Sequence, residues 1–297
     1  MEVLCIGNSA YDITILVDNY PTENKKIRLS DNIIECGGGS ASNVAYLLSH
    51  WGINTTIASV IGYDYQGQVI ETEYKKIGIN LKYLEKRNIK TSTSYIITNK
   101  ENGSRTILIN RDKDLRFSKI KEINDKYDLI YTDGSFSDIA YNTILNNKDS
   151  KSILDAGRVT DDILKLCQVV DYIICSNDFA RTYSGIDFKY DDIDSLKKVY
   201  DKIQSDFKGL LIITLESFGS FVKLNNEYML IPSIKVKQID STGAGDIYHG
   251  AFIYFLLKDY SILDCMKYSN IAGGISVTRI GGRNSIPTLE EVVNYVE

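Results

Sequence analysis

The sequence has little histidine and proline, and its cysteines are scattered. Only two histidines occur among 297 residues, so a zinc site or a histidine-based catalytic triad is poorly supplied. The five cysteines show no C-x-x-C spacing, which predicts small core residues in a reduced, cytoplasmic protein. With only three prolines, the chain contains no proline-rich spacer.

The features that define several other protein classes are also missing. No apolar run approaches the roughly 18 residues that cross a bilayer, and the start shows no signal-peptide pattern, so we expect no membrane partner. A net charge of −5 gives no general attraction for nucleic acid. The chain lacks a G-x-x-x-x-G-K-[ST] loop, an H-R-D loop and a G-x-G-x-x-G turn after a strand. These absences exclude Walker-type NTPases, protein kinases and NAD-dependent dehydrogenases.

Short β-branched runs alternate with segments of helical length. Most of these runs are apolar throughout, as expected for strands that helices cover on both faces. The expected strands are Val3–Ile6, Thr55–Ile61, Leu129–Thr132, Ser152–Asp155, Tyr172–Cys175 and Leu210–Leu215. Val44, Leu47, Leu48 and Trp51 follow helical spacing, and Gly52 stands at the expected helix end. This order predicts an α/β fold with a largely parallel sheet.

Residues 11–36 and 92–110 break this pattern, because strand-like runs follow one another there without helices. The runs are Asp12–Val17, Ile27–Glu35, Thr93–Thr98 and Arg105–Ile109, and Asn102-Gly103 indicates a hairpin between the last two. We interpret them as a small β-sheet inserted into one domain of residues 1–297, where it would act as a lid that excludes water from a cleft. An extension of the main sheet is the alternative.

The segment 236–258 carries the strongest chemical pattern. A strand-like end leads into Gly243-Ala244-Gly245-Asp246, and a helix of apolar periodicity follows. The glycines let the backbone approach a ligand, and the unpaired N–H groups of a helix start favour an anion such as phosphate. Asp246 would either cap the helix or take a proton from an incoming hydroxyl, and the local pattern leaves both open.

Two segments near the N-terminus suit a polyol ligand. Gly37-Gly38-Gly39 precedes a helix whose first turn contains Asn43, which offers both a donor and an acceptor. A turn followed by a helix cap is the alternative. Asp12 follows the first expected strand, at the edge where α/β folds bind ligands.

Together these segments resemble the ribokinase-like (PfkB) family of carbohydrate kinases, which includes ribokinase, fructokinase, ketohexokinase and adenosine kinase. The resemblance covers the whole chain in order. It rests on Gly7…Asp12, Gly38-Gly39-x-x-x-Asn43-x-Ala45, Thr214-Leu215-Glu216-Ser217-Phe218-Gly219, Asp240-Ser241-Thr242-Gly243-Ala244-Gly245-Asp246 and Thr278 to Pro287.

The resemblance implies a three-layer αβα sandwich with a largely parallel central sheet and a small β-sheet lid. It implies transfer of the γ-phosphoryl group of ATP to a hydroxyl of a small sugar, with Mg²⁺, in several members with K⁺, and in a homodimer paired through the lid. A nucleoside kinase and a kinase of an anionic sugar such as sulfofructose stay open as alternatives. A binding protein without catalysis would gain nothing from Asp246.

The resemblance also implies a role for individual residues. Asp246 would be the base, and the N–H groups of Gly243, Ala244 and Gly245 would form the anion hole. The acceptor would contact Asp12, Gly38, Gly39, Asn43, Arg105 and Asn110. The nucleotide would lie along Thr214, Gly219, Gly243, Gly245 and Asn270. A monovalent cation would have ligands from Asp240, Thr242, Ser276, Arg279, Gly281 and Ser285.

Two departures from the family pattern affect these expectations. Where the family often has an Asn-x-x-Glu motif that organises magnesium through water, Asn177 is followed by Ala180, and Asp178 is the nearest acid. Lys26, Asn110 and Arg111 resemble the sulfofructose kinase branch, yet Ser135 stands where that branch has an arginine. A neutral ketose or pentose is therefore the expected acceptor.

Overall fold

The computed structural model describes residues 1–29 and 33–295, and its centre is a nine-stranded sheet. The strands from β11 to β5 are parallel, and β12 and β13 are antiparallel. In spatial order they are β13 (Glu227–Ile231), β12 (Ser220–Leu224), β11 (Leu210–Thr214), β10 (Tyr172–Cys175), β9 (Lys151–Ala156), β8 (Leu129–Thr132), β1 (Glu2–Ile6), β4 (Asn54–Gly62) and β5 (Asn80–Arg87). All six strands expected from apolar runs are confirmed.

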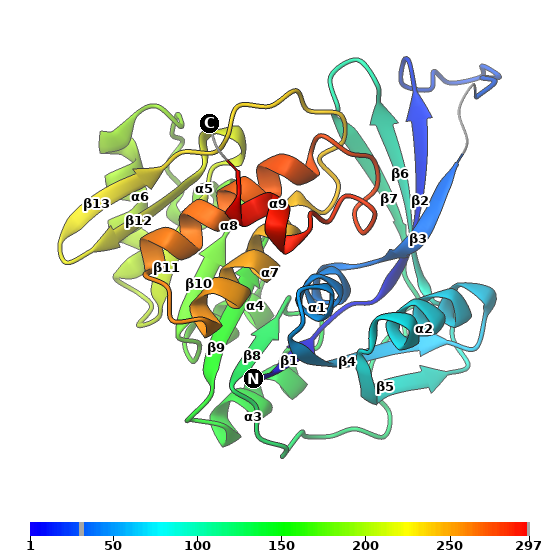
Figure 1. Cartoon of the computed structure of the whole chain (residues 1–297), viewed down its shortest axis with the longest axis horizontal. Helices are drawn as coiled ribbons and strands as arrows, with labels where there is room; N and C mark the ends of the chain where they lie inside the picture. The colour runs from blue at the N-terminus through cyan, green and yellow to red at the C-terminus, as the bar shows by residue number, and fades with distance from the viewer. Residues whose placement is uncertain (30–32, 296–297) are drawn as a thin grey trace.

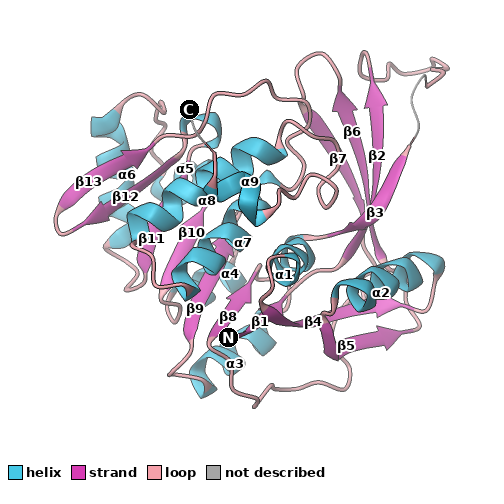
Figure 2. Ribbon diagram, viewed as in Figure 1, coloured by secondary structure: helices cyan, strands magenta, loops and turns pink. Residues whose placement is uncertain are grey.

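Helices cover both faces of this sheet (Figures 1 and 2). One face packs on α1 (Ser40–His50), α2 (Tyr65–Ile77), α7 (Ala244–Leu257), α8 (Ile262–Ser276) and α9 (Leu289–Val293). The other packs on α3 (Ser137–Asn146), α4 (Asp161–Cys167), α5 (Asn177–Ser184) and α6 (Ile193–Gln204). In β1, Val3 and Cys5 join the first core while Leu4 and Ile6 join the second, which explains why the strand is apolar throughout. The three-layer αβα architecture is confirmed.

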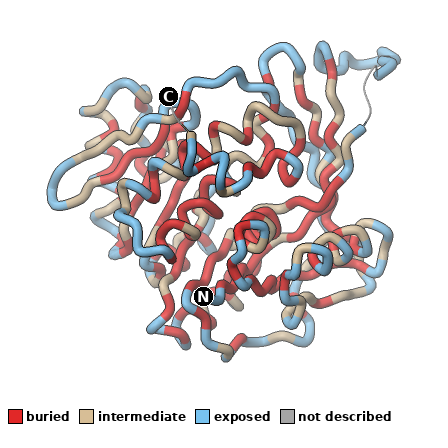
Figure 3. The backbone as a smooth tube through the Cα atoms, in the orientation of Figure 1, coloured by how far each residue is buried: buried red, intermediate tan, exposed pale blue. Residues whose placement is uncertain are grey.

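A separate four-stranded sheet stands beside the main one, next to α2 (Figure 1). Its order is β3 (Ile34–Gly38), β2 (Ala10–Val17), β6 (Ser92–Asn99) and β7 (Arg105–Asn110). The middle pair is parallel and the two outer pairs are antiparallel. The expected small β-layer is therefore a sheet of its own and not an extension of the main sheet. Its far ends are exposed, whereas the central strands of the main sheet are buried (Figure 3).

The sequence placed one strand of the small sheet wrongly. We expected a strand over 27–35, but 27–29 and 33 are irregular, and 30–32 lie outside the described residues. Strand β3 begins at Ile34, opposite Thr14, and runs on through Gly37 and Gly38 to pair with Ala10. Residues 23–29 are exposed and form no strand, so Ile27 and Leu29 do not extend β3.

Three strands of the main sheet were not expected from the sequence. Strands β12 and β13 form a hairpin whose turn residues, Asn225 and Asn226, have φ of 49° and 67°. Two adjacent Asn residues at positive φ are typical of a two-residue hairpin turn, so this signal was present and was overlooked. Edge strand β5 has no continuous apolar run, because charged residues interrupt it and end it, and it pairs with β4 alone.

Helices α1 and α7 pack against each other and bring the two ends of the chain together. Val44, Leu47 and Leu48 of α1 and Ile247 and Ala251 of α7 are fully buried in one core. The N-termini of both helices lie near the carboxyl ends of the central parallel strands, the usual ligand-binding edge of such a sheet. Within the described ranges, no helix is both long and apolar enough to span a membrane.

Candidate active site

The start of α7 is built to hold an anion. Gly243 is the N-cap residue with φ of 75°, and none of the described side chains caps this end of the helix. The Ala244 N–H has only a long contact of 3.4 Å to the Ser241 carbonyl oxygen. A Cβ added to Gly245 would meet nothing within 4 Å, so this glycine faces open space. Polar N–H groups at the positive end of a helix therefore face a space that a phosphate can enter.

Asp246 lies in the first turn of α7 and is held by a residue from the other end of the chain. Asn43 Nδ2 of α1 donates a hydrogen bond to Asp246 Oδ2 at 2.8 Å. Desolvation by the surrounding protein raises the pKa of Asp246 to about 6, and the hydrogen bond from Asn43 opposes this rise. The side chain does not cap its own helix. A carboxylate with a pKa near 6 is better suited to accept a proton at neutral pH than an ordinary aspartate.

Two interacting side chains, His249 and Asp155, influence the charge of Asp246. His249, one turn further along α7, has Nε2 3.4 Å from Asp155 Oδ1 at the end of β9, and Tyr131 donates to the other oxygen of Asp155 at 3.5 Å. The Asp155 carboxylate adds to the rise in the pKa of Asp246, and His249 opposes it. The sequence had indicated no role for His249, because a lone histidine carries no spacing signal.

The polyol segments meet at the bottom of the small sheet. A Cβ on Gly38 would lie 1.9 Å from Asp12 Oδ2, so only glycine leaves room for this carboxylate. Gly39 has φ of 93°, which favours glycine, and α1 begins at the next residue. Burial raises the pKa of Asp12 to about 6, while a hydrogen bond with Ser94 lowers it. The structure thus brings Asp12, Gly38 and Gly39 together beside α1, which carries Asn43.

Two polar atoms at this place are buried and lack a partner among the described residues. They are Oδ1 of Asn43 and Oδ1 of Asn8, which follows β1. A buried acceptor without a donor costs about 1–3 kcal/mol, so such atoms usually serve a ligand or a bound water. Both atoms are fit to accept hydrogen bonds from ligand hydroxyl groups.

Asp133, at the end of β8, is a site residue that sequence reasoning missed. Its Oδ2 accepts from the N–H groups of Asn8 at 2.8 Å and Ala41 at 3.2 Å, and its Oδ1 accepts from Ser135 at 2.9 Å. Burial raises its pKa although these hydrogen bonds lower it. Asp133 therefore fixes the loop after β1 to the start of α1. A carboxylate directly after an apolar strand was the available signal, whereas Asp12, which was expected at such a position, lies within β2.

A buried arginine network underlies the glycine segment and was also missed. Arg283, 5% exposed, contacts the carboxylate of Glu73 from α2 and the hydroxyl of Ser42 from α1. Glu73 in turn accepts from the Gly37 N–H at 3.1 and 3.2 Å. Arg283 thus ties the C-terminal segment to the floor of the acceptor region.

The two expected acceptor residues of β7 lie apart. Asn110 is opposite Thr93, which is opposite Tyr11, so its side chain lies on the face of the small sheet that carries Tyr11, whereas Asp12, the next residue, lies on the other face. Arg105 is at the other end of the strand, about 17 Å away at about 3.4 Å per residue, and it contacts the hydroxyl of Ser241 in the loop before α7. The structure therefore places Asn110 near the Asp12 segment but on the opposite face of the sheet, and it places Arg105 against the loop before α7.

The expected nucleotide residues surround the end of β11. Thr214 Oγ1 donates to the Cys175 carbonyl oxygen at 3.2 Å. Gly219 has φ of 103°, and a Cβ there would lie 2.0 Å from the Ile231 carbonyl oxygen. Asn270 is buried in α8 and donates to that same oxygen at 2.9 Å. Asn270 therefore holds the β12–β13 hairpin in position with its side-chain amide.

The expected cation residues are only partly brought together by side-chain contacts. Asp240 is 1% exposed, accepts from the N–H and hydroxyl of Thr242 through Oδ1, and accepts from the Gly281 N–H through Oδ2. The hydroxyl groups of Ser276 and Ser285 donate to carbonyl groups of their own segments. Asp240 forms no ion pair with any described residue. A buried carboxylate without a counter-charge suits a monovalent cation.

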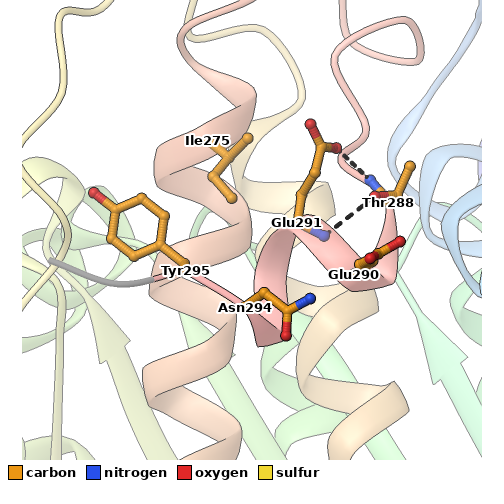
Figure 4. A pocket seen from close by; sticks show the side chains of 6 residues that line it. All are labelled: Ile275, Thr288, Glu290, Glu291, Asn294 and Tyr295. Atoms are coloured by element: carbon orange, nitrogen blue, oxygen red, sulfur yellow. Dashed lines mark hydrogen bonds between the residues drawn. The ribbon is translucent and has the colours of Figure 1, made fainter.

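A pocket of about 660 Å³ lies elsewhere, between α8 and the C-terminal helix α9. Figure 4 shows its lining, in which Thr288 and Glu291 exchange two hydrogen bonds as a capping box at the start of α9. None of its lining residues belongs to the candidate site, so it does not bear on the chemistry described above.

Comparisons with known proteins agree with this arrangement. The nucleoside kinase of Methanocaldococcus jannaschii is 25% identical over 307 aligned residues, covering 100% of this chain and 97% of that protein. The ribokinase of Staphylococcus aureus is 26% identical, covering 98% of each. The structure of Arabidopsis thaliana ribokinase complexed with ribose and ATP superimposes with a TM-score of 0.81 at 19% identity, covering 98% of this chain and 97% of that one.

The model of one protein family, described as pfkB family carbohydrate kinase, matches residues 1–289. The match contains both sheets, the acceptor segment and the Gly243–Asp246 loop. The chain therefore belongs to the pfkB family of carbohydrate kinases, phosphotransferases whose acceptor is an alcohol group.

Proposed function

We propose that this chain is an ATP-dependent kinase that phosphorylates a hydroxyl of a small, neutral carbohydrate, a ketose or a pentose. The observation that carries the proposal is Asp246, a carboxylate with a pKa of about 6 in the first turn of a helix whose N-terminus no described side chain caps. The base and the anion site thus lie within one turn of α7, the arrangement that phosphoryl transfer to a hydroxyl needs.

In the proposed reaction, Asp246 takes the proton of the acceptor hydroxyl as its oxygen attacks the γ-phosphorus of ATP, and ADP leaves. The N–H groups of Gly243, Ala244 and Gly245 stabilise the negative charge on the transferring group. Asn43 orients the base through its 2.8 Å hydrogen bond. Because the pKa of Asp246 is near 6, most of the base is ionised at neutral pH yet retains more affinity for a proton than a free aspartate.

The acceptor is proposed to be a polyol held at the base of the small sheet. The carboxylate of Asp12 is buried there, and the buried Oδ1 atoms of Asn8 and Asn43 need hydrogen-bond donors. Several hydroxyl groups on one small molecule supply such donors. Gly38 leaves room for the Asp12 carboxylate, and the small sheet acts as the lid over the acceptor.

The nucleotide is proposed to lie along Thr214 and Gly219, with its phosphates at the start of α7. The Arabidopsis ribokinase is described as a complex with ribose and ATP, and this chain shares its fold. Mg²⁺ bound with the triphosphate supplies neutralisation of its charge. The buried and unpaired carboxylate of Asp240 suits K⁺, with oxygen ligands from Thr242 and nearby carbonyl groups, among which Ser276 and Gly281 are candidates.

We also propose a homodimer paired through the small sheet, in a cytoplasmic protein. Strand β7 is the edge of that sheet, and Ile107, Leu108 and Ile109 on it are 41%, 56% and 69% exposed. An exposed apolar edge strand favours pairing with another chain. Light scattering should give twice the chain mass, and Ile109→Lys should give a monomer. All five cysteines are buried free thiols, in keeping with a reducing compartment.

Two other acceptors are supported by particular observations. A nucleoside is favoured by the M. jannaschii relative and by the ring pair of Tyr11 and Tyr65, 6.2 Å apart beside the acceptor strand. An anionic sugar is favoured by Arg111, whose pKa is lowered by burial and by Arg158 while the nearby Asp133 opposes the change. Lys26 is exposed and contributes nothing specific.

An ADP-release assay over pentoses, ketoses, sulfonated and phosphorylated sugars and nucleosides tests the proposal. We expect one class of neutral sugar to raise ADP release well above the rate without acceptor. Turnover with nucleosides or anionic sugars alone would replace the proposed acceptor, and no stimulation by any acceptor would contradict the kinase role.

Asp246→Asn tests the proposed base directly. The amide keeps the shape but cannot take a proton, so kcat should fall by about 10²–10⁴-fold while ATP binding by calorimetry is retained. Asp138→Asn is the matched control, because Asp138 is another first-turn aspartate, exposed at the start of α3. Equal activity of the two variants would show that Asp246 is not the base.

A further inference from the structure

We propose that Glu216 is the residue through which this enzyme recognises the divalent cation of its nucleotide, by a water-mediated contact. The inference rests on the proposed ATP-dependent function and assigns to this chain a metal-sensing carboxylate from the loop after β11. In α5 the acid that the family pattern often has is replaced by Ala180, which is buried in the core, and Asp178 is the nearest acid.

The first observation is the backbone of Glu216. This residue begins a 3-10 turn, η1 (Glu216–Phe218), with φ of 53°, in the left-handed region that glycine favours. A non-glycine residue there costs about 1–2 kcal/mol. Such strain persists where the surroundings fix it, and it concentrates at functional positions. A carboxylate is therefore retained at this point of the loop in spite of its backbone cost.

The second observation is how the carboxylate is held. Asn177, the first residue of α5 and 8% exposed, donates from Nδ2 to Glu216 Oε1 at 2.9 Å, and the same amide contacts the hydroxyl of Tyr190. A buried amide on a helix thus aims one oxygen of an exposed side chain. Because the hydrogen bond uses Oε1, Oε2 and the remaining lone pairs stay available for a further ligand.

The third observation is the place of this carboxylate among the other charges. Glu216 lies two residues beyond Thr214 and three before Gly219, the proposed nucleotide residues at the carboxyl edge of the sheet. No lysine, arginine or histidine of the described residues forms an ion pair with it. An unpaired carboxylate repels a triphosphate beside it unless a cation lies between the two.

A divalent metal ion that keeps part of its water shell fits this position best. Carboxylate oxygens are preferred ligands of Mg²⁺, which retains several waters and is bound by one or two carboxylates together with substrate phosphates. In the part of the chain that is described, no three acidic, histidine or cysteine side chains gather as a metal site. One carboxylate that accepts a hydrogen bond from a metal-bound water is consistent with this small number of protein ligands.

The test measures nucleotide affinity of the whole chain by calorimetry, with ADP as the probe, in Mg²⁺ and in EDTA. The wild type should bind ADP more tightly with Mg²⁺. In Glu216→Gln the gain from Mg²⁺ should shrink by about tenfold to a hundredfold, the value of one hydrogen bond to a charged group. Metal-free ADP should bind Glu216→Gln more tightly than the wild type, because the repulsion is gone.

Two further variants separate a metal role from a structural one. Glu216→Gly removes both the carboxylate and the backbone strain, so it should be at least as stable as the wild type and still lose the Mg²⁺ gain. Glu227→Gln, an exposed acid in β13, is the matched control and should keep the gain. Electron paramagnetic resonance with Mn²⁺ and ADP reports the metal itself, and its affinity should fall in parallel in the two Glu216 variants.

The outcomes distinguish this inference from the proposed function. An unchanged Mg²⁺ gain in Glu216→Gln and Glu216→Gly would overturn the role of Glu216 and leave the kinase proposal intact. Loss of the gain in Asp178→Asn but not in the Glu216 variants would assign the role to Asp178 instead. A wild-type chain that binds no ADP under either condition would overturn the nucleotide site and this inference with it.

Discussion

Replacing Asn43 with alanine removes the stronger of the two hydrogen bonds that favour the charged form of the proposed base. Asn43 Nδ2 donates to Asp246 Oδ2 at 2.8 Å, while desolvation acts in the opposite direction and raises the pKa of Asp246 to about 6. In Asn43→Ala the desolvation is unopposed by this donor. The pKa of Asp246 must therefore rise above its wild-type value.

The size of this rise in pKa follows from the negative charge of the Asp246 carboxylate, which accepts the hydrogen bond. A hydrogen bond to a charged group contributes about 1.5–3 kcal/mol, and one pKa unit corresponds to about 1.36 kcal/mol. The loss of this bond should raise the pKa of Asp246 by about one to two units. Because a base acts only when ionised, the activity falls as the pH drops through this pKa. The acidic limb of kcat should move from about pH 6 to between about 7 and 8.

The assay is ADP release at saturating acceptor, measured across this pH range. The kcat of Asn43→Ala should be clearly reduced near neutral pH and should approach the wild type at alkaline pH. Carbon-13 NMR of labelled aspartate, assigned with Asp246→Asn, reads the pKa without turnover. Asn147→Ala is the control, since Asn147 is equally buried but bonds a carbonyl at the end of α3. An acidic limb that stays at its wild-type position in Asn43→Ala would refute the reasoning.

Two further predictions concern the backbone and the buried charge that frame the site. Gly243→Ala places a Cβ on a residue with φ of 75°, 3.0 Å from the Cα of Gly282, so the free energy of unfolding in urea should fall by about 1–2 kcal/mol. Gly245→Ala is the control, because its Cβ would meet nothing within 4 Å and should leave the stability nearly unchanged. Equal losses in the two variants would contradict this account. Arg283→Met leaves the carboxylate of Glu73 without its counter-charge and should lower the free energy of unfolding by about 3 kcal/mol. The double variant Arg283→Met/Glu73→Gln should recover part of this loss. If Arg283→Met is as stable as the wild type, the ion pair contributes nothing to stability.

The layers of the fold follow from local sequence, whereas several of its strand limits do not. A strand with cores on both faces must be apolar throughout, and β8 and β10 were predicted at their observed limits for this reason. Strands β12 and β13 were missed although the Asn225-Asn226 turn between them was a readable signal. Strand β3 was misplaced because it ends in glycines, whose low strand propensity is outweighed here by pairing with β2.

The candidate site likewise has parts that local sequence predicts and parts that it does not. The Gly243–Asp246 loop is contiguous in sequence, so its pattern could be read and its anion-binding geometry predicted. Arg283 and Glu73 are 210 residues apart, and Asn177 and Glu216 are 39 apart, so no local periodicity joins them. Their pairing depends on which strands are neighbours in the sheet. A residue such as Glu216 can be recognised only when its backbone conformation and its partner are both known.

The contact between Asn43 and Asp246 spans 203 positions of the chain and has a consequence for protein synthesis. A ribosome completes the segment with Asn43 early, but the helix that carries Asp246 emerges only after more than four fifths of the polypeptide has been made. A nascent or prematurely terminated product therefore has the proposed sugar-binding half without the proposed base. Under the proposed mechanism such fragments lack the group that takes the proton, so they would not transfer a phosphoryl group.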